Sequence, residues 1–225
     1  MTYAFIQARC GSMRLPNKVL LPICGKPVLQ HIAERVRYCK TIDKIIVLTS
    51  INAENDAIEN LCNQIDIPCF RGSEDDVLDR FKNAIREFNI QDNDTIIRIT
   101  GDCPLCSPDI IDVIAYVHHD NDLTTNCIQR TFPDGLDVEC FKASMLFSPV
   151  FYKVNPFELE YDIKNFDGTG FRVTNIIQEK NFSELRWTLD TQEDYEFISK
   201  IYEALYKPGQ IFMMEDILKW LAKQN

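Results

Sequence analysis

Thr95-Ile-Ile-Arg-Ile-Thr100 is a nearly continuous apolar run, which is typical of a strand buried on both faces of a parallel sheet. Working outward from it, Lys44-Ile-Ile-Val-Leu-Thr49 is a second such run, and Tyr3 to Ala8 is a shorter one near the start of the chain. Segments with helical spacing separate or follow these runs, at 27–39, 53–65, 75–88 and 107–117. This alternation predicts an α/β, Rossmann-like fold with a mostly parallel sheet and helices on both faces.

The second half of the chain loses this regular alternation after Asp122 to Cys127. Leu136 to Phe141 and Arg186 to Asp190 are predicted strands, and 192–206 is a predicted helix. No linker or internal repeat divides the 225 residues, so we expect one domain covering residues 1–225. Within it, segment 130–185 is predicted to be a small elaboration that binds an acceptor and contributes dimer contacts.

Composition excludes several classes of protein. The chain has 45% hydrophobic and 26% charged residues, which is typical of a globular protein. Its net charge of −10 argues against nucleic-acid binding through many phosphate contacts. No apolar run approaches the roughly 18 to 20 residues of a membrane-spanning helix, and no signal segment is evident. We therefore expect a cytoplasmic enzyme without a membrane or nucleic-acid partner, whose nine cysteines are thiols.

One cysteine pair, Cys103-Pro-Leu-Cys106, has the spacing of half a zinc site or of a redox motif. The remaining cysteines provide no second pair with that spacing, and the pair lies in the middle of the chain. We interpret it as two small buried thiols.

The loop after the first strand, Ala8-Arg-Cys-Gly-Ser-Met-Arg-Leu-Pro-Asn-Lys18, carries the three cations Arg9, Arg14 and Lys18. Ligands of parallel α/β sheets bind outside the carboxyl ends of strands, and this loop lies at the first such end. The small residues that let backbone amides approach a phosphate are Ala8, Gly11 and Ser12. The loop is therefore predicted to bind a polyanion, although it has neither a Walker A sequence nor a Gly-x-Gly-x-x-Gly sequence.

Two aspartates occupy corresponding places at the ends of predicted strands. Asp102 follows the run that ends at Thr100, and Asp190 ends the late predicted strand. Two carboxylates beside a triphosphate suit Mg²⁺, which prefers oxygen ligands and substrate phosphates. The alternative is that each aspartate caps the helix that follows it.

Asp134-Gly-Leu-Asp-Val-Glu139 forms a third acidic group. Strand alternation puts Asp137 and Glu139 on one face of the predicted strand and the intervening apolar residues on the other. This face is either a solvated edge or, with Asp134, an acceptor pocket whose carboxylates bind sugar hydroxyls or amines.

Two Asp-x-Asp strings, Asp92-Asn-Asp94 and Asp120-Asn-Asp122, resemble the metal motif of sugar-transferring glycosyltransferases. Both precede strands, which puts them at the opposite edge of the sheet from the first loop. We interpret them as turn residues, and this disfavours a glycosyltransferase.

Five ordered motifs resemble the cytidylyltransferase family that includes acylneuraminate and KDO cytidylyltransferases, and most closely its spore coat polysaccharide biosynthesis branch. They are Ile6-Gln-Ala-Arg-x-Gly-Ser-x-Arg-Leu-Pro-x-Lys18, Phe70-Arg-Gly-Ser-Glu-Asp-Asp-Val-Leu-Asp-Arg-Phe81, Arg98-Ile-Thr-Gly-Asp-Cys-Pro-Leu105, Phe132-Pro-Asp-Gly-Leu-Asp-Val-Glu139 and Thr188-Leu-Asp-Thr-Gln-Glu-Asp-Tyr195. Together they span most of the chain.

The resemblance implies a nucleotide-diphospho-sugar transferase fold and transfer of CMP from CTP to an acidic, nonulosonate-like sugar, in surface polysaccharide or glycoconjugate biosynthesis. It implies that Lys18, Arg14 and Asp102 are catalytic and that Asp102 and Asp190 bind Mg²⁺. The nucleotide-binding set is Ala8, Arg9, Gly11, Ser12, Arg14, Lys18 and Ser73, where Ser73 rests on the resemblance alone. The implied acceptor-binding set is Asp134, Asp137 and Glu139, and we expect a homodimer.

The stretch Phe157 to Ile163 departs from the family, because the branch usually carries an Arg-Glu-His-Val-Thr-like string there and this stretch has no histidine. The acceptor is therefore the least determined part of the prediction. Open alternatives are a phosphorylated alditol as acceptor, a nucleotide with another base, and a non-catalytic nucleotide-binding homologue.

Overall fold

A seven-stranded sheet forms the centre of the computed structural model, which describes residues 1–149, 151, 168 and 170–224. Its strand order is β5-β4-β1-β6-β8-β7-β9. The bounds are β1 (Thr2–Gln7), β4 (Lys44–Ser50), β5 (Cys69–Gly72), β6 (Thr95–Thr100), β7 (Leu123–Thr125), β8 (Glu139–Lys142) and β9 (Val173–Asn175). Strand β8 runs antiparallel to both of its neighbours, and the other described pairings in this sheet are parallel. The predicted mostly parallel α/β sheet is confirmed.

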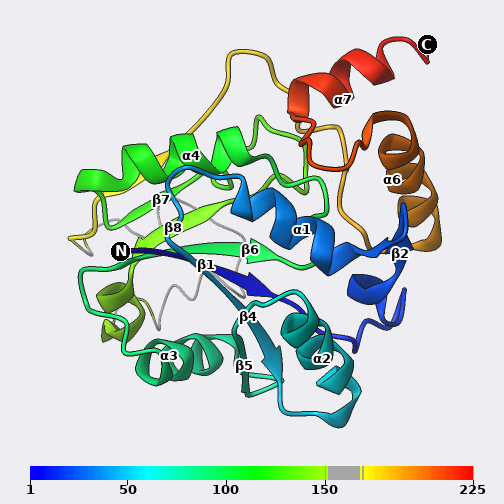
Figure 1. The fold of residues 1–225 in the computed structure, drawn as a ribbon. Coiled ribbons are helices and arrows are strands. Elements are labelled where there is room, and N and C mark those ends of the chain that lie inside the picture. The colour runs from blue at the N-terminus through cyan, green and yellow to red at the C-terminus, as the bar shows by residue number, and fades with distance from the viewer. Residues whose placement is uncertain (150, 152–167, 169, 225) are drawn as a thin grey trace.

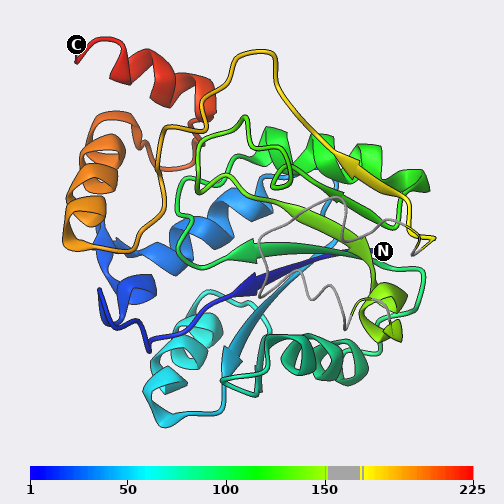
Figure 2. The ribbon, with the colours of Figure 1, turned by 180° about the vertical axis from the view of Figure 1, so that it is seen from behind.

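Helices cover both faces of this sheet, as predicted (Figures 1 and 2). One face carries α1 (Val28–Arg37), α2 (Asp56–Gln64) and α4 (Pro108–Val117), and the other carries α3 (Val77–Glu87). Two later helices, α6 (Gln192–Leu205) and α7 (Met214–Leu221), pack on the side of α1. No helix in the described part of the chain is long and apolar enough to cross a membrane.

The alternation of side chains along β1 explains how one strand contributes to both cores. Ala4 and Ile6 join the core beneath α1, whereas Phe5 packs on Phe81 of α3 with ring centroids 5.4 Å apart. Gln7, the last residue of β1, pairs with Leu48 on β4 and Thr100 on β6. The carboxyl ends of three parallel strands are therefore level, and the loops that leave them meet at one edge of the sheet.

The predicted strand from Leu136 to Phe141 is partly wrong, because the observed strand begins only at Glu139. Before it, Asp134 is held by the segment near Trp187: the Asp134 amide donates to the Leu185 carbonyl at 2.9 Å, and the Trp187 amide donates to the Asp134 carbonyl at 2.6 Å. The backbone groups of Asp134 are thus engaged outside the strand ladder of the sheet.

The predicted strand from Arg186 to Asp190 is also wrong. Only a single bridge, between Asp134 and Arg186, forms there. The apolar residues of this segment, Trp187 and Leu189, are nevertheless fully buried. Apolar residues alternate here because every second side chain is buried against the core. A segment can bury its side chains in this way without forming a strand ladder.

The solvated edge-strand interpretation of the Asp137 and Glu139 face is corrected by the strand order. Strand β8 lies between β6 and β7, so it is an interior strand, and Glu139 is only 4% exposed. The sequence analysis did not predict strands β5 and β9, which span only four and three residues. It also did not predict helix α7, although its apolar residues Met214, Ile217, Leu218 and Leu221 have helical spacing.

Candidate active site

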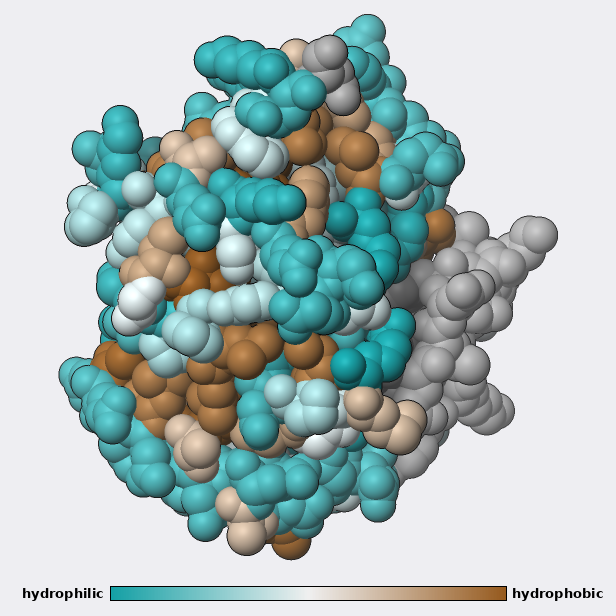
Figure 3. Space-filling model, turned by 90° about the vertical axis from the view of Figure 1, so that its right-hand side faces the viewer, coloured by the Kyte–Doolittle hydropathy of each residue, from teal (hydrophilic) through white to brown (hydrophobic). Residues whose placement is uncertain are grey.

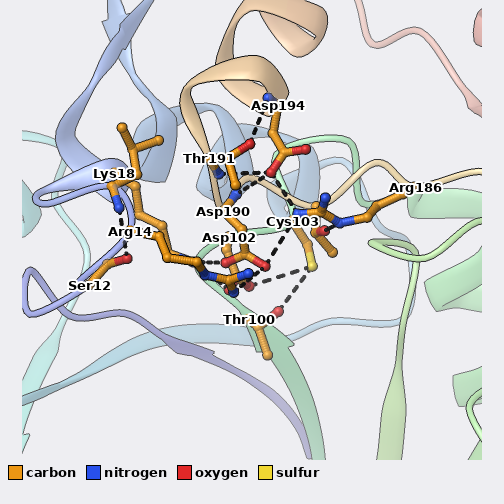
Figure 4. A network of polar contacts seen from close by, with 12 residues as sticks. Ser12, Arg14, Lys18, Thr100, Asp102, Cys103, Arg186, Asp190, Thr191 and Asp194 are labelled. Atoms are coloured by element: carbon orange, nitrogen blue, oxygen red, sulfur yellow. Dashed lines mark hydrogen bonds and ion pairs between the residues drawn. The ribbon is translucent and has the colours of Figure 1, made fainter.

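Lys18 stands at the centre of a polar cluster at the carboxyl edge of the sheet (Figure 4). It begins a short 3-10 turn, Lys18–Leu20, just after Asn17, whose φ of 57° places it in the left-handed region. The Lys18 side chain is only 11% exposed, and its Nζ donates to Asp102 Oδ2 at 2.8 Å and to Asp190 Oδ1 at 2.7 Å. Three segments far apart in the sequence therefore meet on one buried ammonium group.

Gly101 sets the position of Asp102. Its amide donates to the Gln7 carbonyl at 2.7 Å, which joins the end of β6 to the end of β1. A Cβ at this position would lie 2.9 Å from the Cβ of Ala8 and 3.0 Å from the Gln7 carbonyl oxygen. Only glycine allows the two strand ends to approach this closely, so Asp102 leaves the sheet directly beside the first loop.

Asp190 is held by backbone hydrogen bonds on both sides. The Leu189 amide donates to the Asp102 carbonyl at 2.8 Å, so the backbones beside the two aspartates are joined. The amides of Asp190 and Thr191 donate to Asp194 Oδ2 at 2.9 and 2.8 Å, within the capping box that starts α6. It is Asp194, and not Asp190, whose carboxylate caps this helix, so the Asp190 carboxylate contacts Lys18 instead.

Gly135 supports the same segment from behind. Its φ of +102° and the 2.7 Å from an added Cβ to the Trp187 carbonyl carbon exclude other residues without rearrangement. The turn predicted at Asp134-Gly135 therefore packs directly against the backbone of the 185–190 segment and helps to fix its position.

The charges of this cluster stabilise one another. Burial by itself lowers the pKa of Lys18, but the carboxylates of Asp102 and Asp190 outweigh this effect and raise that pKa above its ordinary value. Burial likewise raises the pKa of Asp102, and the Lys18 ammonium outweighs it, so the pKa of Asp102 lies below its ordinary range. Both groups are therefore ionised at neutral pH.

Arginines surround this central pair. Arg14, 66% exposed, lies 3.0 Å from Asp190 Oδ2, and Arg186 lies 3.5 Å from the same oxygen while pairing with Asp194 at 2.6 Å. Arg9, on the opposite side of the loop, pairs with Glu74 at 2.8 Å. The cations of the first loop are thus oriented by acidic residues of other segments.

A cavity of about 390 Å³ opens at this edge. Figure 3 views the molecule from this side, and hydrophilic residues gather across the middle of that face. The predicted residues that line the cavity are Ala8, Arg9, Gly11, Ser12, Arg14, Lys18, Asp102 and Asp190. Sequence reasoning missed six further lining residues, namely Gln7, Met13, Val19, Arg98, Thr100 and Gly101. A signal for Arg98 was present, since it is the one charged residue in the run 95–100.

Four predicted site residues are not among those that line this cavity. The Ser73 hydroxyl accepts from the Asp76 amide at 3.0 Å and so shapes the turn before α3. Asp137 and Asp134 pair with Arg130 at 2.9 and 3.6 Å.

Glu139, the fourth, points toward Arg98 and pairs with it at 2.5 Å. Burial raises the pKa of Asp137 above its ordinary value. The acidic group predicted to bind the acceptor is therefore divided between two arginines.

The donor set at Lys18 fits a magnesium ion. The carboxylates of Asp102 and Asp190 both contact the Lys18 ammonium, at 2.8 and 2.7 Å, so they lie close together, and Mg²⁺ typically binds one or two carboxylates together with substrate phosphates and waters. Among the described residues no group of three or more His, Cys, Asp or Glu side chains could hold a metal by itself. The pair Cys103 and Cys106 consists of buried free thiols, as interpreted from the sequence.

The Asp-x-Asp strings lie at the opposite edge. Asp94 accepts from the Gln91 amide at 2.9 Å and pairs with the α-amino group of Met1 at 2.6 Å, beside the start of β6. The Asp122 carboxylate accepts from the Arg172 amide at 2.8 Å just before β7. The residues 92–94 form a turn, as predicted, whereas Asp120 ends a 3-10 helix, His118–Asp120, and Asp122 follows it. The stretch 157–163 lies outside the described residues.

Comparisons with known proteins agree with this geometry. A model of the cytidylyltransferase family matches residues 3–211. The spore coat polysaccharide biosynthesis protein SpsF of Bacillus subtilis is 34% identical over 210 residues, which cover 88% of this chain and 85% of that protein. The solved structure of a cytidylyltransferase from Leptospira borgpetersenii is 31% identical, with a TM-score of 0.85 over 99% of this chain and 94% of that one.

Other curated relatives are matched over less than half of their length. One of them is the 8-amino-3,8-dideoxy-manno-octulosonate cytidylyltransferase of Shewanella frigidimarina, which is 37% identical over 109 residues. That alignment covers 48% of this chain and 44% of the relative.

Proposed function

Because the chain belongs to the cytidylyltransferase family, we propose that it transfers CMP from CTP to an acidic, nonulosonate-like sugar and releases pyrophosphate. The pathway that fits is the biosynthesis of a surface polysaccharide or glycoconjugate. The observation that carries the proposal is the contact of Lys18 with both Asp102 and Asp190 inside a cavity lined by Arg9 and Arg14.

The reaction needs positioning and charge stabilisation more than it needs covalent chemistry. An acceptor oxygen attacks the α-phosphate in line with the departing pyrophosphate, and no covalent enzyme intermediate is required. Lys18, Arg14 and Arg9 offset negative charge on the phosphates, and the amides near Gly11 and Ser12 can approach them closely. We propose Lys18 and Arg14 as catalytic residues on this basis.

Asp102 and Asp190 are the residues that would hold Mg²⁺, which when bound supplies positive charge to the triphosphate. Since Lys18 holds the pKa of Asp102 below its ordinary range, the Asp102 carboxylate is a weak base. We therefore assign Asp102 to ligand binding and not to removal of the acceptor proton. Ser73 stays our candidate for a contact with the nucleoside.

An acidic sugar acceptor is supported by the names of relatives, among them an octulosonate cytidylyltransferase. A phosphorylated alditol is the alternative acceptor. We also propose a homodimer in which segment 130–185 supplies contacts. Asp134 and Asp137, which both pair with Arg130, stay our candidates for contacts with the acceptor.

Nucleotide selectivity tests this proposal directly. CTP with Mg²⁺ should raise the melting temperature more than ATP, GTP or UTP, because a ligand that binds only the folded state stabilises it by mass action. Equal shifts for all four nucleotides would contradict the assignment of cytidine. Pyrophosphate release with CTP, measured against a panel of acidic sugars and an alditol phosphate, then identifies the acceptor class.

A further inference from the structure

Three neighbouring strands change from apolar to polar near the carboxyl edge, on the face that α3 covers. In the register of β1 with β6, Arg98 lies beside Phe5, so the change on β1 comes one step later, at Gln7. The polar residues, one from each of β1, β6 and β8, are Gln7, Arg98 and Glu139, and we refer to them as the polar row. Their apolar counterparts, two positions away on the same strands and facing the α3 core, are Phe5, Ile96 and Phe141. Arg98 and Glu139 are paired directly in the register of β6 with β8.

Hydrogen bonds fix the guanidinium of Arg98 within this row. Its Nε donates to Gln7 Oε1 at 3.1 Å, and its Nη1 donates to Glu139 Oε2 at 2.5 Å. The side chains of Arg98 and Glu139 are 14% and 6% exposed. Charges this deeply buried are costly unless paired, so this arrangement leaves the guanidinium little freedom to turn.

Arg98 nevertheless faces a ligand space, because it lines the cavity together with Lys18 and Asp102. The other cavity-lining cations among the described residues, Arg9, Arg14 and Lys18, belong to the phosphate-binding loop after β1. Arg98 comes from the sheet itself, on β6, the strand that ends two residues before Asp102. Arg98 is therefore the cation that we expect to contact a ligand other than the triphosphate.

The Arg98 guanidinium is a positive charge held in one orientation at the cavity wall by Gln7 and Glu139, and a charge that is already fixed loses little entropy when a carboxylate binds to it. We infer that Arg98 recognises the carboxylate of the acceptor sugar and that Glu139 is a positioning residue that acts through Arg98. This inference rests on the proposed function, and it moves Glu139 from direct acceptor contact to support of Arg98. Gln7 holds the guanidinium on its other side.

Two chemical changes made together test the inference. Acceptor kinetics are measured by pyrophosphate release with N-acetylneuraminate, 3-deoxy-manno-octulosonate or its 8-amino analogue, whichever is turned over, and with the carboxamide of that sugar. For wild type, the carboxamide should raise the acceptor KM or lower kcat/KM by roughly 10²-fold, as expected for a buried charged site left without its partner. With the acidic sugar, Arg98→Met should have a kcat/KM lower than that of wild type by roughly the same factor. With the carboxamide, Arg98→Met and wild type should have nearly the same kcat/KM.

The dissociation constant of CTP, measured by calorimetry, should change much less than the acceptor KM in Arg98→Met, because Arg98 belongs to β6 and not to the loop that carries Arg9, Arg14 and Lys18. Glu139→Gln should raise the acceptor KM about tenfold, and Arg98→Lys should recover part of the loss because it keeps the charge without the guanidinium. Arg71→Met is the matched control: Arg71 is also paired with acids and lies on β5 at the same sheet edge, but it does not line the cavity. Its acceptor KM should be unchanged.

Arg98→Met could fail to fold because Glu139 would be left buried without its partner. The double variant Arg98→Met with Glu139→Leu removes both charges, and the carboxamide comparison on wild type needs no variant. Equal losses of acid and carboxamide in the Arg98 variants, or an unchanged acceptor KM, would overturn the inference while leaving the proposed function intact. Binding of CTP with no turnover of any acidic sugar would overturn the proposed acceptor, and the role of Arg98 with it.

Discussion

The two edges of the central sheet use the same residue types for different purposes. At the amino edge, Asp94 bonds the α-amino group of Met1 and a nearby amide, and Asp43 accepts from the Thr2 amide at 2.7 Å. At the carboxyl edge, Asp102 and Asp190 both turn to the buried ammonium of Lys18. Acids that bond backbone groups fix where strands begin, whereas acids that converge on a buried cation build a site. An aspartate at a strand end is therefore informative only with its partner.

Removing the Lys18 ammonium should have the largest effect on turnover. Lys18→Ala is expected to lower turnover by roughly 10² or more, because a charge contact to the phosphates is lost in the transition state. Lys44→Ala is the matched control at the amino edge, where the Lys44 ammonium lies 5.8 Å from the centre of the Tyr3 ring. Pyrophosphate release at saturating CTP and acceptor measures both variants. Near-normal turnover in Lys18→Ala would remove this lysine from the catalytic set.

Neutralising the acids one at a time should separate them. Asp102→Asn is expected to abolish Mg²⁺-dependent turnover more completely than Asp190→Asn, because Asp102 follows directly from β6 whereas Asp190 lies in a segment without a strand ladder. Turnover is measured across a range of Mg²⁺ concentrations, with Asp43→Asn as the control from the amino edge. The assignment fails if a structure with Mg²⁺ and CTP places neither carboxylate within direct or one-water reach of the metal.

The smallest expected effect is on stability and depends on pH. The pKa of Asp102 is lowered in the folded state, so its contribution is complete above its unfolded value of about 4 and is lost as the pH falls through the folded value. The pKa of Lys18 is raised, so its contribution is complete below about 10 and is lost as the pH rises through the folded value.

Ligand-free Lys18→Ala should therefore be less stable than wild type by about 1 to 3 kcal/mol between these limits, since a mostly buried carboxylate loses its partner. The difference should shrink as the pH falls from about 4 through the lower folded-state pKa of Asp102, where that carboxylate becomes protonated. Urea denaturation at pH 3, 5 and 7 measures it. A difference in unfolding free energy that stays constant down to pH 3 would show that the contact between Lys18 and Asp102 does not make stability depend on pH.

The sequence predicted well those elements that carry a long periodic pattern. The strand predicted at Thr95 to Thr100 has those bounds in the structure, and the predicted strand at Lys44 to Thr49 ends one residue later, at Ser50. The strand prediction failed at Leu136 to Val138 and at Arg186 to Asp190, where apolar residues alternate without a strand ladder. Alternation reports which side chains are buried, and a segment held by other backbone contacts can bury the same side chains.

The candidate site divides in the same way. The sequence by itself determined the loop chemistry, because Arg9, Arg14 and Lys18 lie within a few positions of one another and so share one loop in any fold. It also placed Asp102 at the end of a buried strand. Only the tertiary structure decided that Asp190 meets the same ammonium as Asp102, and that Glu139 serves Arg98 instead of facing solvent. The physical reason is that a carboxylate contacts whichever charge the packing of distant strands brings within about 3 Å, and sequence spacing carries no information about that distance.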